Sequence, residues 1–254
     1  MSFSFHVVIP SRFDSSRLPG KPLLEIGDKS LLQHVYDSAR DSDAEKIIIA
    51  TDDERIEDSA RSYGADVIIT AKDHLSGTDR IAEVIKLRNL ADDLIIVNVQ
   101  GDEYGLPARL INQVALALEK NPGSVMATLC ERIESAEEFN NPAVVKVVRD
   151  IHGSALYFSR SGIPSGLGNQ NSQTDKTSIY RHIGLYAYRA GFLRKYSELK
   201  PCELESNESL EQLRVLYNGY SIHVAEAETI AGVGVDTEAD LKKVRESVTS
   251  DYEK

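Results

Sequence analysis

Three cationic side chains lie within ten residues near the N-terminus of a chain that is otherwise acidic. Arg12, Arg17 and Lys21 follow an apolar run at residues 5–9, and two serines and a glycine stand among them. Guanidinium groups pair with phosphate oxygens, an ammonium adds a point charge, and small residues expose backbone N–H groups. This pattern favours a phosphate-binding loop over the other interpretation, a solvated loop with incidental charge. The residues expected to contact phosphate are Arg12, Ser15, Ser16, Arg17 and Lys21.

The loop lacks the two best-known nucleotide-binding spacings. Neither GxxxxGK[ST] nor GxGxxG follows the first apolar run, so neither a Walker loop nor a redox dinucleotide site is predicted.

Two aspartates come directly after apolar stretches. Asp102 follows the run at residues 94–99, and Asp236 follows residues 232–235. Ligands of open parallel sheets bind beyond the carboxyl ends of the strands. Carboxylate oxygens suit a hard cation such as Mg²⁺, with phosphate and water completing the octahedron. We therefore expect a magnesium site at Asp102 and Asp236, although each aspartate alone is equally typical of a helix cap or turn.

Apolar runs alternate with helix-period stretches over the first half of the chain, which predicts right-handed βαβ units and an α/β fold. We expect a mostly parallel central sheet with helices on both faces and a small mixed-sheet region in the second half. The predicted strands are residues 5–9, 47–50, 67–69, 94–99, 144–148, 155–158, 183–188 and 222–225. The predicted helices are residues 31–39, 52–60, 81–87, 190–199, 210–218 and 239–248.

Composition limits the classes of function. The 254 residues fit one domain, and 29 cationic against 40 acidic side chains give a net charge of −11. Such a surface repels nucleic acid and anionic membranes, so neither is expected as a partner. No apolar run approaches the ~20 residues that span a bilayer, and the first ten residues do not resemble a signal peptide. Two cysteines without metal or redox spacing complete the expectation of a cytoplasmic protein.

The motifs occur in the collinear order of a known enzyme family. Together they resemble the CMP-Kdo synthetases, which are 3-deoxy-manno-octulosonate cytidylyltransferases, over nearly the whole chain. Single motifs occur in other sugar nucleotidyltransferases, but the full set is specific. The matching segments are Pro-Ser-Arg-x-x-Ser-Ser-Arg-Leu-Pro-Gly-Lys-Pro at 10–22, Ala-Thr-Asp-Asp at 50–53, His-x-Ser-Gly-Thr-Asp-Arg at 74–80, Val-Asn-Val-Gln-Gly-Asp-Glu at 97–103, Ala-Leu-Tyr-Phe-Ser-Arg at 155–160, Arg-His-Ile-Gly-Leu-Tyr-Ala-Tyr at 181–188, Leu-Glu-Gln-Leu-Arg at 210–214 and Gly-Val-Asp-Thr at 234–237.

The resemblance implies a Rossmann-like nucleotidyltransferase fold in a single domain. It implies that CMP passes from CTP to the anomeric hydroxyl of the acid sugar Kdo for lipopolysaccharide biosynthesis, with release of pyrophosphate. Residues 1–130 would form the nucleotide-binding half, and residues 131–248 would bind the sugar and form a homodimer.

The resemblance also implies roles for individual residues. The implied catalytic residues are Arg17, Lys21, Asp102 and Asp236, of which the two aspartates are the Mg²⁺ ligands. The implied nucleotide-binding residues are Arg12, Ser15, Ser16, Arg17, Lys21, Ser76, Gly77, Arg80 and Asp102. The implied sugar-binding residues are Gln100, Arg160, His182, Glu211 and Gln212.

Three departures from the family pattern concern the rim of the sugar site, and one of them is the unusually polar loop at residues 166–178. Tyr104-Gly105 stands where the family usually has proline, and Ser165 stands where it usually has an aromatic residue.

The alternative substrates are 8-amino-Kdo, a sialic-type acid, or a sugar phosphate with another nucleotide. A nucleotide-binding domain without turnover is a further alternative, although such a domain has no need of two metal acids.

Overall fold

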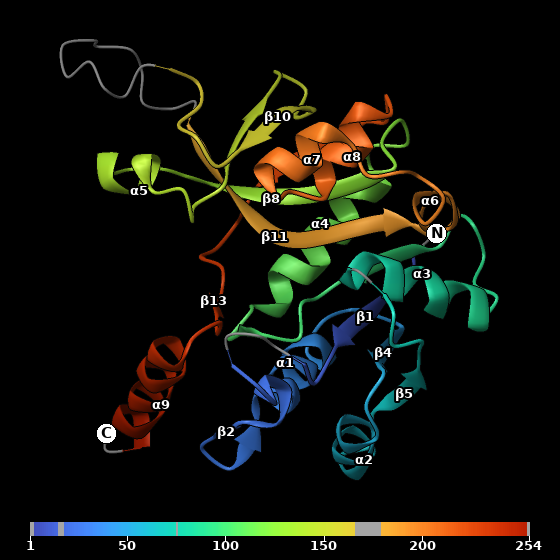
Figure 1. Ribbon diagram of the computed structural model, residues 1–254, viewed down its shortest axis with the longest axis vertical. Helices are drawn as coiled ribbons and strands as arrows, with labels where there is room; N and C mark the ends of the chain where they lie inside the picture. Colours follow the sequence, from blue (N-terminus) through green and yellow to red (C-terminus); the bar gives the residue numbers. More distant parts are fainter. Residues whose placement is uncertain (1–2, 15–17, 75, 166–178, 253–254) are drawn as a thin grey trace.

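A computed structural model of the chain describes residues 3–14, 18–74, 76–165 and 179–252 (Figure 1). Its main feature is a nine-stranded sheet with the order β10-β9-β11-β6-β1-β4-β5, in which β8 pairs with β11 and β12 pairs with β8. The strands are β1 (Phe5–Ser11), β4 (Lys46–Thr51), β5 (Asp66–Ile69), β6 (Ile95–Asn98), β8 (Met126–Arg132), β9 (Lys146–Arg149), β10 (Ala155–Ser159), β11 (Tyr180–Arg189) and β12 (Ile222–Glu226).

The first half of the sheet is parallel. All seven residues of β1 are buried, and β1 lies between β4 and β6 in parallel register, with β5 beyond β4. A strand that is covered on both faces needs a continuous apolar run, and residues 5–9 supply it. The predicted βαβ arrangement is confirmed here, and the carboxyl ends of β1 and β6 open at the same edge of the sheet.

The second half is mixed because one long strand changes the direction of pairing. β11 runs antiparallel to β6, β8 and β9, with an irregularity between Ile183 and Tyr186. The strands predicted at residues 144–148 and 155–158 correspond to β9 and β10, which pair antiparallel and form a hairpin. The mixed-sheet region is therefore continuous with the central sheet.

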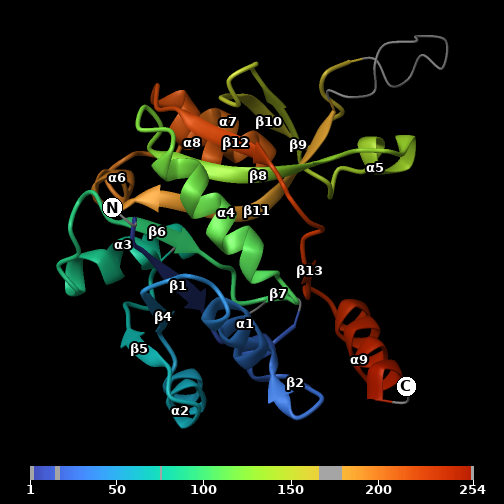
Figure 2. The ribbon, with the colours of Figure 1, turned by 180° about the vertical axis from the view of Figure 1, so that it is seen from behind.

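Helices cover both faces of the sheet, as predicted. One apolar core contains side chains of α1, α2 and α4, and the other contains side chains of α3, α6 and α8; Figure 2 shows α1 and α4 together on one face. Among the described residues no helix is long and apolar enough to cross a membrane. The bounds are α1 (Leu31–Arg40), α2 (Glu54–Ser62), α3 (Gly77–Leu87), α4 (Ala108–Glu119), α5 (Ala136–Asn140), α6 (Ala190–Tyr196), α7 (Glu203–Glu208), α8 (Gln212–Tyr217) and α9 (Glu238–Tyr252).

Polar side chains fix where three of these helices begin. Ser30, Asp53 and Ser76 each accept a hydrogen bond from a backbone N–H in the first turn of α1, α2 and α3. Such caps replace partners that the first turn of a helix lacks. The cap on α3 explains why this helix begins four residues before its predicted start at Ile81.

A two-stranded ladder joins distant parts of the chain below the sheet. β13 (Val233–Gly234) pairs antiparallel with β7 (Glu103–Tyr104), and Val235 N–H donates to the Asp102 carbonyl at 2.9 Å. After β13 the chain enters α9, which packs through Leu241 and Val244 near β2 (Glu25–Ile26). Figure 1 shows α9 lying apart from the sheet, on the side of β2. The ladder and this helix fix the C-terminal segment to the N-terminal half.

Gly232 allows the ladder to form, so Gly232→Ala is expected to destabilise it. An added Cβ would lie 2.5 Å from the Tyr104 carbonyl oxygen and 2.7 Å from the Leu106 nitrogen, and both are backbone atoms that cannot turn aside. We expect a loss of about 1–3 kcal/mol in the free energy of unfolding, as for other overpacked sites, measured by urea denaturation. Gly123→Ala is the matched control because nothing lies within 4 Å of its added Cβ. Equal stability of both variants would contradict the expectation.

Candidate active site

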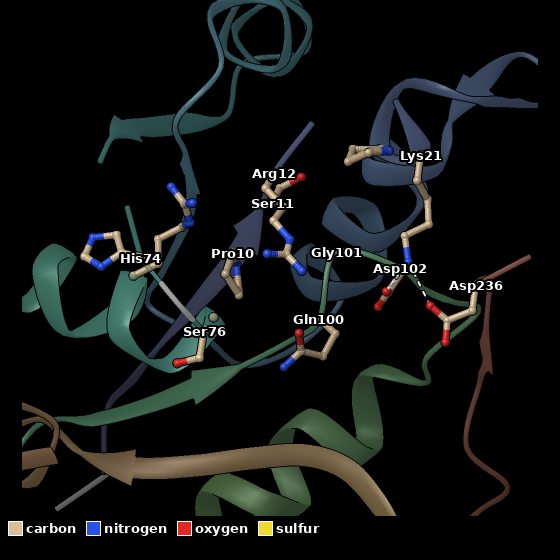
Figure 3. A pocket seen from close by; sticks show the side chains of 13 residues that line it. Pro10, Ser11, Arg12, Lys21, His74, Ser76, Gln100, Gly101, Asp102 and Asp236 are labelled. Atoms are coloured by element: carbon tan, nitrogen blue, oxygen red, sulfur yellow. Dashed lines mark hydrogen bonds and ion pairs between the residues drawn. The ribbon is translucent and has the colours of Figure 1, made fainter. Parts of the chain in front are cut away.

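A pocket of about 250 Å³ lies at the carboxyl ends of β1 and β6. It is lined from four directions, by the loop after β1, by the first turn of α3, by the loop after β6 and by the segment after β13 (Figure 3). This is the place where ligands of open parallel sheets bind. The sequence-predicted residues that line it are Arg12, Lys21, Ser76, Gly77, Arg80, Gln100, Asp102 and Asp236. Ser15, Ser16 and Arg17 lie outside the described residues.

Lys21 lies between the two predicted metal ligands. Its Nζ is 2.5 Å from Asp102 Oδ2 and 3.0 Å from Asp236 Oδ1. Lys21 begins the short 3-10 helix η1 (Lys21–Leu23), after Gly20 in the left-handed conformation at φ +69°. Figure 3 shows the lysine side chain extending toward both carboxylates, one from the loop after β6 and the other from the segment after β13. The carboxylates therefore converge on a single position that a cation fills.

These two carboxylates fit a divalent cation only if the ligand completes the site. Among the described residues no group of three His, Cys, Asp or Glu side chains could hold a metal ion. A Mg²⁺ ion is usually held by one or two carboxylates together with substrate phosphates and water. The donor set at Asp102 and Asp236 therefore matches a metal that binds together with a phosphorylated substrate.

Glu103 is a third carboxylate here that the sequence analysis did not select. Burial and the negative charges of Asp102 and Asp236 raise the pKa of Glu103 to about 7. Burial, the larger cause, disfavours the charged form of the carboxyl group, and the two neighbouring negative charges act in the same direction. The sequence signal for Glu103 is its place beside Asp102 in the motif at 97–103. As a residue of β7, it lies next to the two aspartates that contact Lys21.

The first turn of α3 forms one wall of the pocket. Ser76 Oγ caps the helix by accepting from Asp79 N–H at 3.1 Å. A side chain on Gly77 would press on the Pro10 ring, because an added Cβ would lie 3.2 Å from Pro10 Cγ. Glycine here lets the end of β1 pass close to the helix, so that backbone N–H groups at the helix N-terminus can approach an anion.

Arg80 lines the pocket, but its guanidinium is held by protein groups. It is only 3% exposed, and it donates to Asp52 Oδ2 at 2.8 Å and also to Thr70 Oγ1. This buried pair ties the end of β4 to the loop after β5. Arg80 therefore forms part of the pocket wall, with its guanidinium bonded to the protein.

Two further polar residues line the pocket without having been predicted. Ser11 is 5% exposed, and its hydroxyl has no hydrogen-bond partner among the described residues. His74 Nε2 lies 2.5 Å from Glu83 Oε2. His74 opens the motif at 74–80 that the sequence analysis singled out, whereas an isolated serine after a strand gives no signal. A buried polar atom without a partner costs free energy, so the Ser11 hydroxyl is a candidate ligand contact.

Two of the predicted sugar-binding residues lie next to the pocket but outside its lining. Thr78 Oγ1, in the first turn of α3, donates to Glu211 Oε1 at 3.0 Å. Burial raises the pKa of Glu211. Gln212 is 2% exposed, and its Nε2 has no partner among the described residues. Glu211 and Gln212 thus continue the polar lining from α3 toward α8, and Gln100, within the pocket, donates to Asn98 Oδ1 at 3.3 Å.

The other two predicted sugar residues are engaged elsewhere. Arg160 donates to the carbonyl oxygens of Glu208 at 2.7 Å and Pro142 at 3.2 Å. His182 Nε2 is 3.0 Å from Thr128 Oγ1. Burial lowers the pKa of His182 to about 3, so the imidazole is neutral at physiological pH. The structure therefore does not bring Arg160 and His182 to the pocket that holds Lys21.

Two of the three departures from the family pattern lie in different environments, and the third, the polar loop at residues 166–178, lies outside the described residues. Tyr104 packs edge-on against His34, with ring centroids 5.0 Å apart, and Gly105 turns the chain at φ +67°. Ser165 is exposed. The first departure therefore belongs to the packing around β7 and α9, and the second lies on the surface.

Comparison with known proteins identifies the family. The sequence model described as cytidylyltransferase matches residues 6–228. A 3-deoxy-manno-octulosonate cytidylyltransferase of Hahella chejuensis is 52% identical over 246 residues, covering 95% of this chain and 96% of the relative. Its counterpart in Nitrosococcus oceani is 50% identical over 248 residues, covering 96% of each.

Solved structures agree with this result. A CMP:2-keto-3-deoxy-manno-octonic acid synthetase complexed with CTP superposes with a TM-score of 0.89 at 41% identity, over 98% of this chain and 100% of that one. A cytidylyltransferase of Leptospira borgpetersenii shares the fold, with a TM-score of 0.63 at 16% identity over 98% of this chain and 88% of that one. By sequence over nearly its whole length, this chain belongs to the 3-deoxy-manno-octulosonate cytidylyltransferase family.

Proposed function

We propose that this enzyme transfers CMP from CTP to the anomeric hydroxyl of Kdo and releases pyrophosphate, in the cytoplasm and for lipopolysaccharide biosynthesis. The observation that carries the proposal is the pocket at the ends of β1 and β6, where Asp102, Asp236 and Lys21 meet. Its support from the comparisons is the similarity to a synthetase complexed with CTP and to relatives named for this reaction.

The cationic residues of the pocket suit the triphosphate. Arg12 and Lys21 line the pocket, although the protein as a whole has a net charge of −11. The sugar hydroxyl attacks the α-phosphorus of CTP in line, the bond to the leaving pyrophosphate breaks, and the hydroxyl proton is released. Negative charge builds up on the transferred group and on pyrophosphate, where fixed cations stabilise it. Arg17, which lies outside the described residues, is proposed to share this role.

We propose Mg²⁺ as the cofactor, held by Asp102 and Asp236. Their carboxylates already point at one cation, and they are the hard oxygen ligands that Mg²⁺ prefers. When bound, the ion would neutralise charge on the phosphoryl oxygens. The protein's part is to hold both carboxylates in place through the β7–β13 ladder.

The sugar is proposed to bind toward α8, where Glu211 and Gln212 lie beside the first turn of α3. A carboxylate and an amide can bind sugar hydroxyls. The roles of Arg160 and His182 as sugar ligands stay predictions. To bind the sugar, Arg160 would have to exchange its present contacts with the Glu208 and Pro142 carbonyl oxygens for new ones. The division into a nucleotide half at 1–130 and a sugar half at 131–248 also stays a prediction.

A panel of sugars tests the substrate. Pyrophosphate release is measured with CTP and Mg²⁺ against Kdo, 8-amino-Kdo, a sialic acid and a sugar phosphate, and then with UTP in place of CTP. We expect turnover to be fastest with Kdo and CTP. Preference for another sugar would revise the substrate, and no turnover with any pair would leave a nucleotide-binding domain.

We also propose a homodimer that forms through the region of residues 155–160. The support is that β10 is an edge strand of the sheet, with Leu156 60% exposed and Ile151 94% exposed at the preceding turn. Exposed apolar side chains on a strand edge favour association. Sedimentation at micromolar concentration is expected to give twice the chain mass of 28.1 kDa, and a monomer mass would refute the proposal.

Asp102→Asn and Asp236→Asn are each expected to lower the rate by at least about 100-fold, the effect of losing one preorganised electrostatic contact. An amide is a weaker ligand for Mg²⁺ than a carboxylate, so turnover should fall although the fold is retained. Initial rates at saturating CTP and Mg²⁺ measure the effect. Asp93→Asn, on the exposed surface, is the matched control, and a near-normal rate in either variant would remove that aspartate from the metal site.

The low pKa of His182 predicts a dependence of stability on pH. Between pH 3 and 6.5 the unfolded chain protonates this imidazole and the folded chain does not, so the stability it contributes is lost as pH falls. From pH 6.5 to 4.5 the wild type should lose up to about 2 kcal/mol more unfolding free energy than His182→Gln. Urea unfolding at both pH values measures this difference. His152→Gln, at an exposed histidine, should behave as wild type, and parallel curves for all three proteins would contradict the prediction.

A further inference from the structure

We propose that Lys21 is an internal counter-ion that holds the position of the divalent cation until nucleotide arrives. In this proposal the ammonium and the divalent cation compete for the same two carboxylates, and the triphosphate receives the displaced lysine. The inference deepens the proposed function and rests on its assignment of Asp102 and Asp236 as metal ligands.

The contacts of the ammonium carry the first step. Lys21 Nζ lies within hydrogen-bond distance of both Asp102 Oδ2 and Asp236 Oδ1, at 2.5 and 3.0 Å. The lysine side chain is 12% exposed, against 30% and 44% for the two carboxylates. A cation that touches both oxygens from the buried side occupies the point where they converge. A metal that uses the same two oxygens therefore meets a positive charge already in place.

The charges explain why a counter-ion is needed without ligand. Asp102 and Asp236 are joined through the β7–β13 ladder, so they cannot separate to relieve their repulsion. Two ionised carboxylates held together without a cation are costly. The lysine offsets part of this negative charge and keeps the geometry of the aspartate pair.

The side chain can also leave. Lysine carries a compact charge on a flexible four-carbon stem, and Lys21 lines the same pocket as Arg12, Ser76 and Gly77. Rotation about its side-chain bonds can move the ammonium from the carboxylates to a phosphate oxygen within this pocket. Nucleotide and metal then assist each other, because a triphosphate that accepts the lysine clears the carboxylates. Such a coupling is reciprocal between the two ligands.

Mn²⁺ binding without nucleotide tests the competition, since Mn²⁺ suits the same oxygen ligands as Mg²⁺ and its free form is counted by electron paramagnetic resonance. Lys21→Met keeps the length of the side chain and removes its charge. We expect Lys21→Met to bind Mn²⁺ about tenfold more tightly than wild type, which corresponds to ~1.4 kcal/mol. Lys120→Met, at an exposed lysine after α4, should bind Mn²⁺ with the affinity of the wild type. Lys21→Arg, which keeps the positive charge, should also bind Mn²⁺ as weakly as the wild type.

Thermal unfolding gives a second readout that needs no activity. Without metal, Lys21→Met should melt below wild type because its carboxylates repel each other, and Mn²⁺ should raise its melting temperature more than that of wild type. Adding Asp102→Asn to Lys21→Met should abolish both the tighter Mn²⁺ binding and the larger rise in melting temperature with Mn²⁺. If Lys21→Met does not fold, Lys21→Gln replaces it in both measurements.

The outcomes separate this inference from the proposed function. Equal Mn²⁺ affinity of wild type and Lys21→Met without nucleotide overturns the counter-ion role, even if CTP promotes Mn²⁺ binding to both. Absence of Mn²⁺ binding in every variant, with and without CTP, overturns the metal assignment as well. The sugar preference is decided by the pyrophosphate panel alone and does not affect either result.

Discussion

The whole site depends on holding two carboxylates of like charge together. Asp102 follows a strand of the parallel sheet, and Asp236 comes from a segment near the C-terminus, so packing of the sheet alone would not bring them together. Hydrogen bonds between β7 and β13, and from Val235 N–H to the Asp102 carbonyl, fix their backbones side by side. Backbone bonds are suited to this task because side-chain charges alone would drive the pair apart.

The C-terminal helix α9 helps to hold Asp236 in place. α9 packs Leu241 and Val244 against Ile26 and Leu31, in a small cluster that also contains Val235. Arg245 Nε donates to the Glu25 carbonyl at 2.8 Å. Burial of this apolar face anchors the segment that carries Asp236. The helix also contacts that segment directly, because Asp240 Oδ2 accepts a hydrogen bond from Asp236 N–H at 3.3 Å. The Tyr104 ring packs against the same cluster and edge-on against His34.

The parallel half of the sheet and the residues at its carboxyl edge could be predicted, because the sequence patterns that indicate them are local. Asp102 and Asp236 each end an apolar stretch, and the alternation of strands and helices placed the carboxyl ends of β1 and β6 at one edge. Helix α4 was missed although Leu110, Ile111 and Val114 follow helical spacing. The β7–β13 ladder could not be predicted, because two residues in each strand form no pattern and the partners are distant in sequence. For the same reason, neither the pairing of Arg80 with Asp52 nor the hold of Glu208 on Arg160 was visible.

The residues that remain without partners suggest where ligand would supply them. Ser11 Oγ lies in the pocket without a hydrogen bond among the described residues, and Gln212 Nε2 lies in the same state beside Glu211. Burying such atoms costs free energy that the fold recovers only if another group pairs with them. These two atoms lie on the walls proposed for the nucleotide and for the sugar. Arg80 and Arg160, in contrast, already have protein partners, so any contact they make with ligand would have to replace an existing bond. Selectivity is therefore expected to depend more on the buried amide and hydroxyl than on these two arginines.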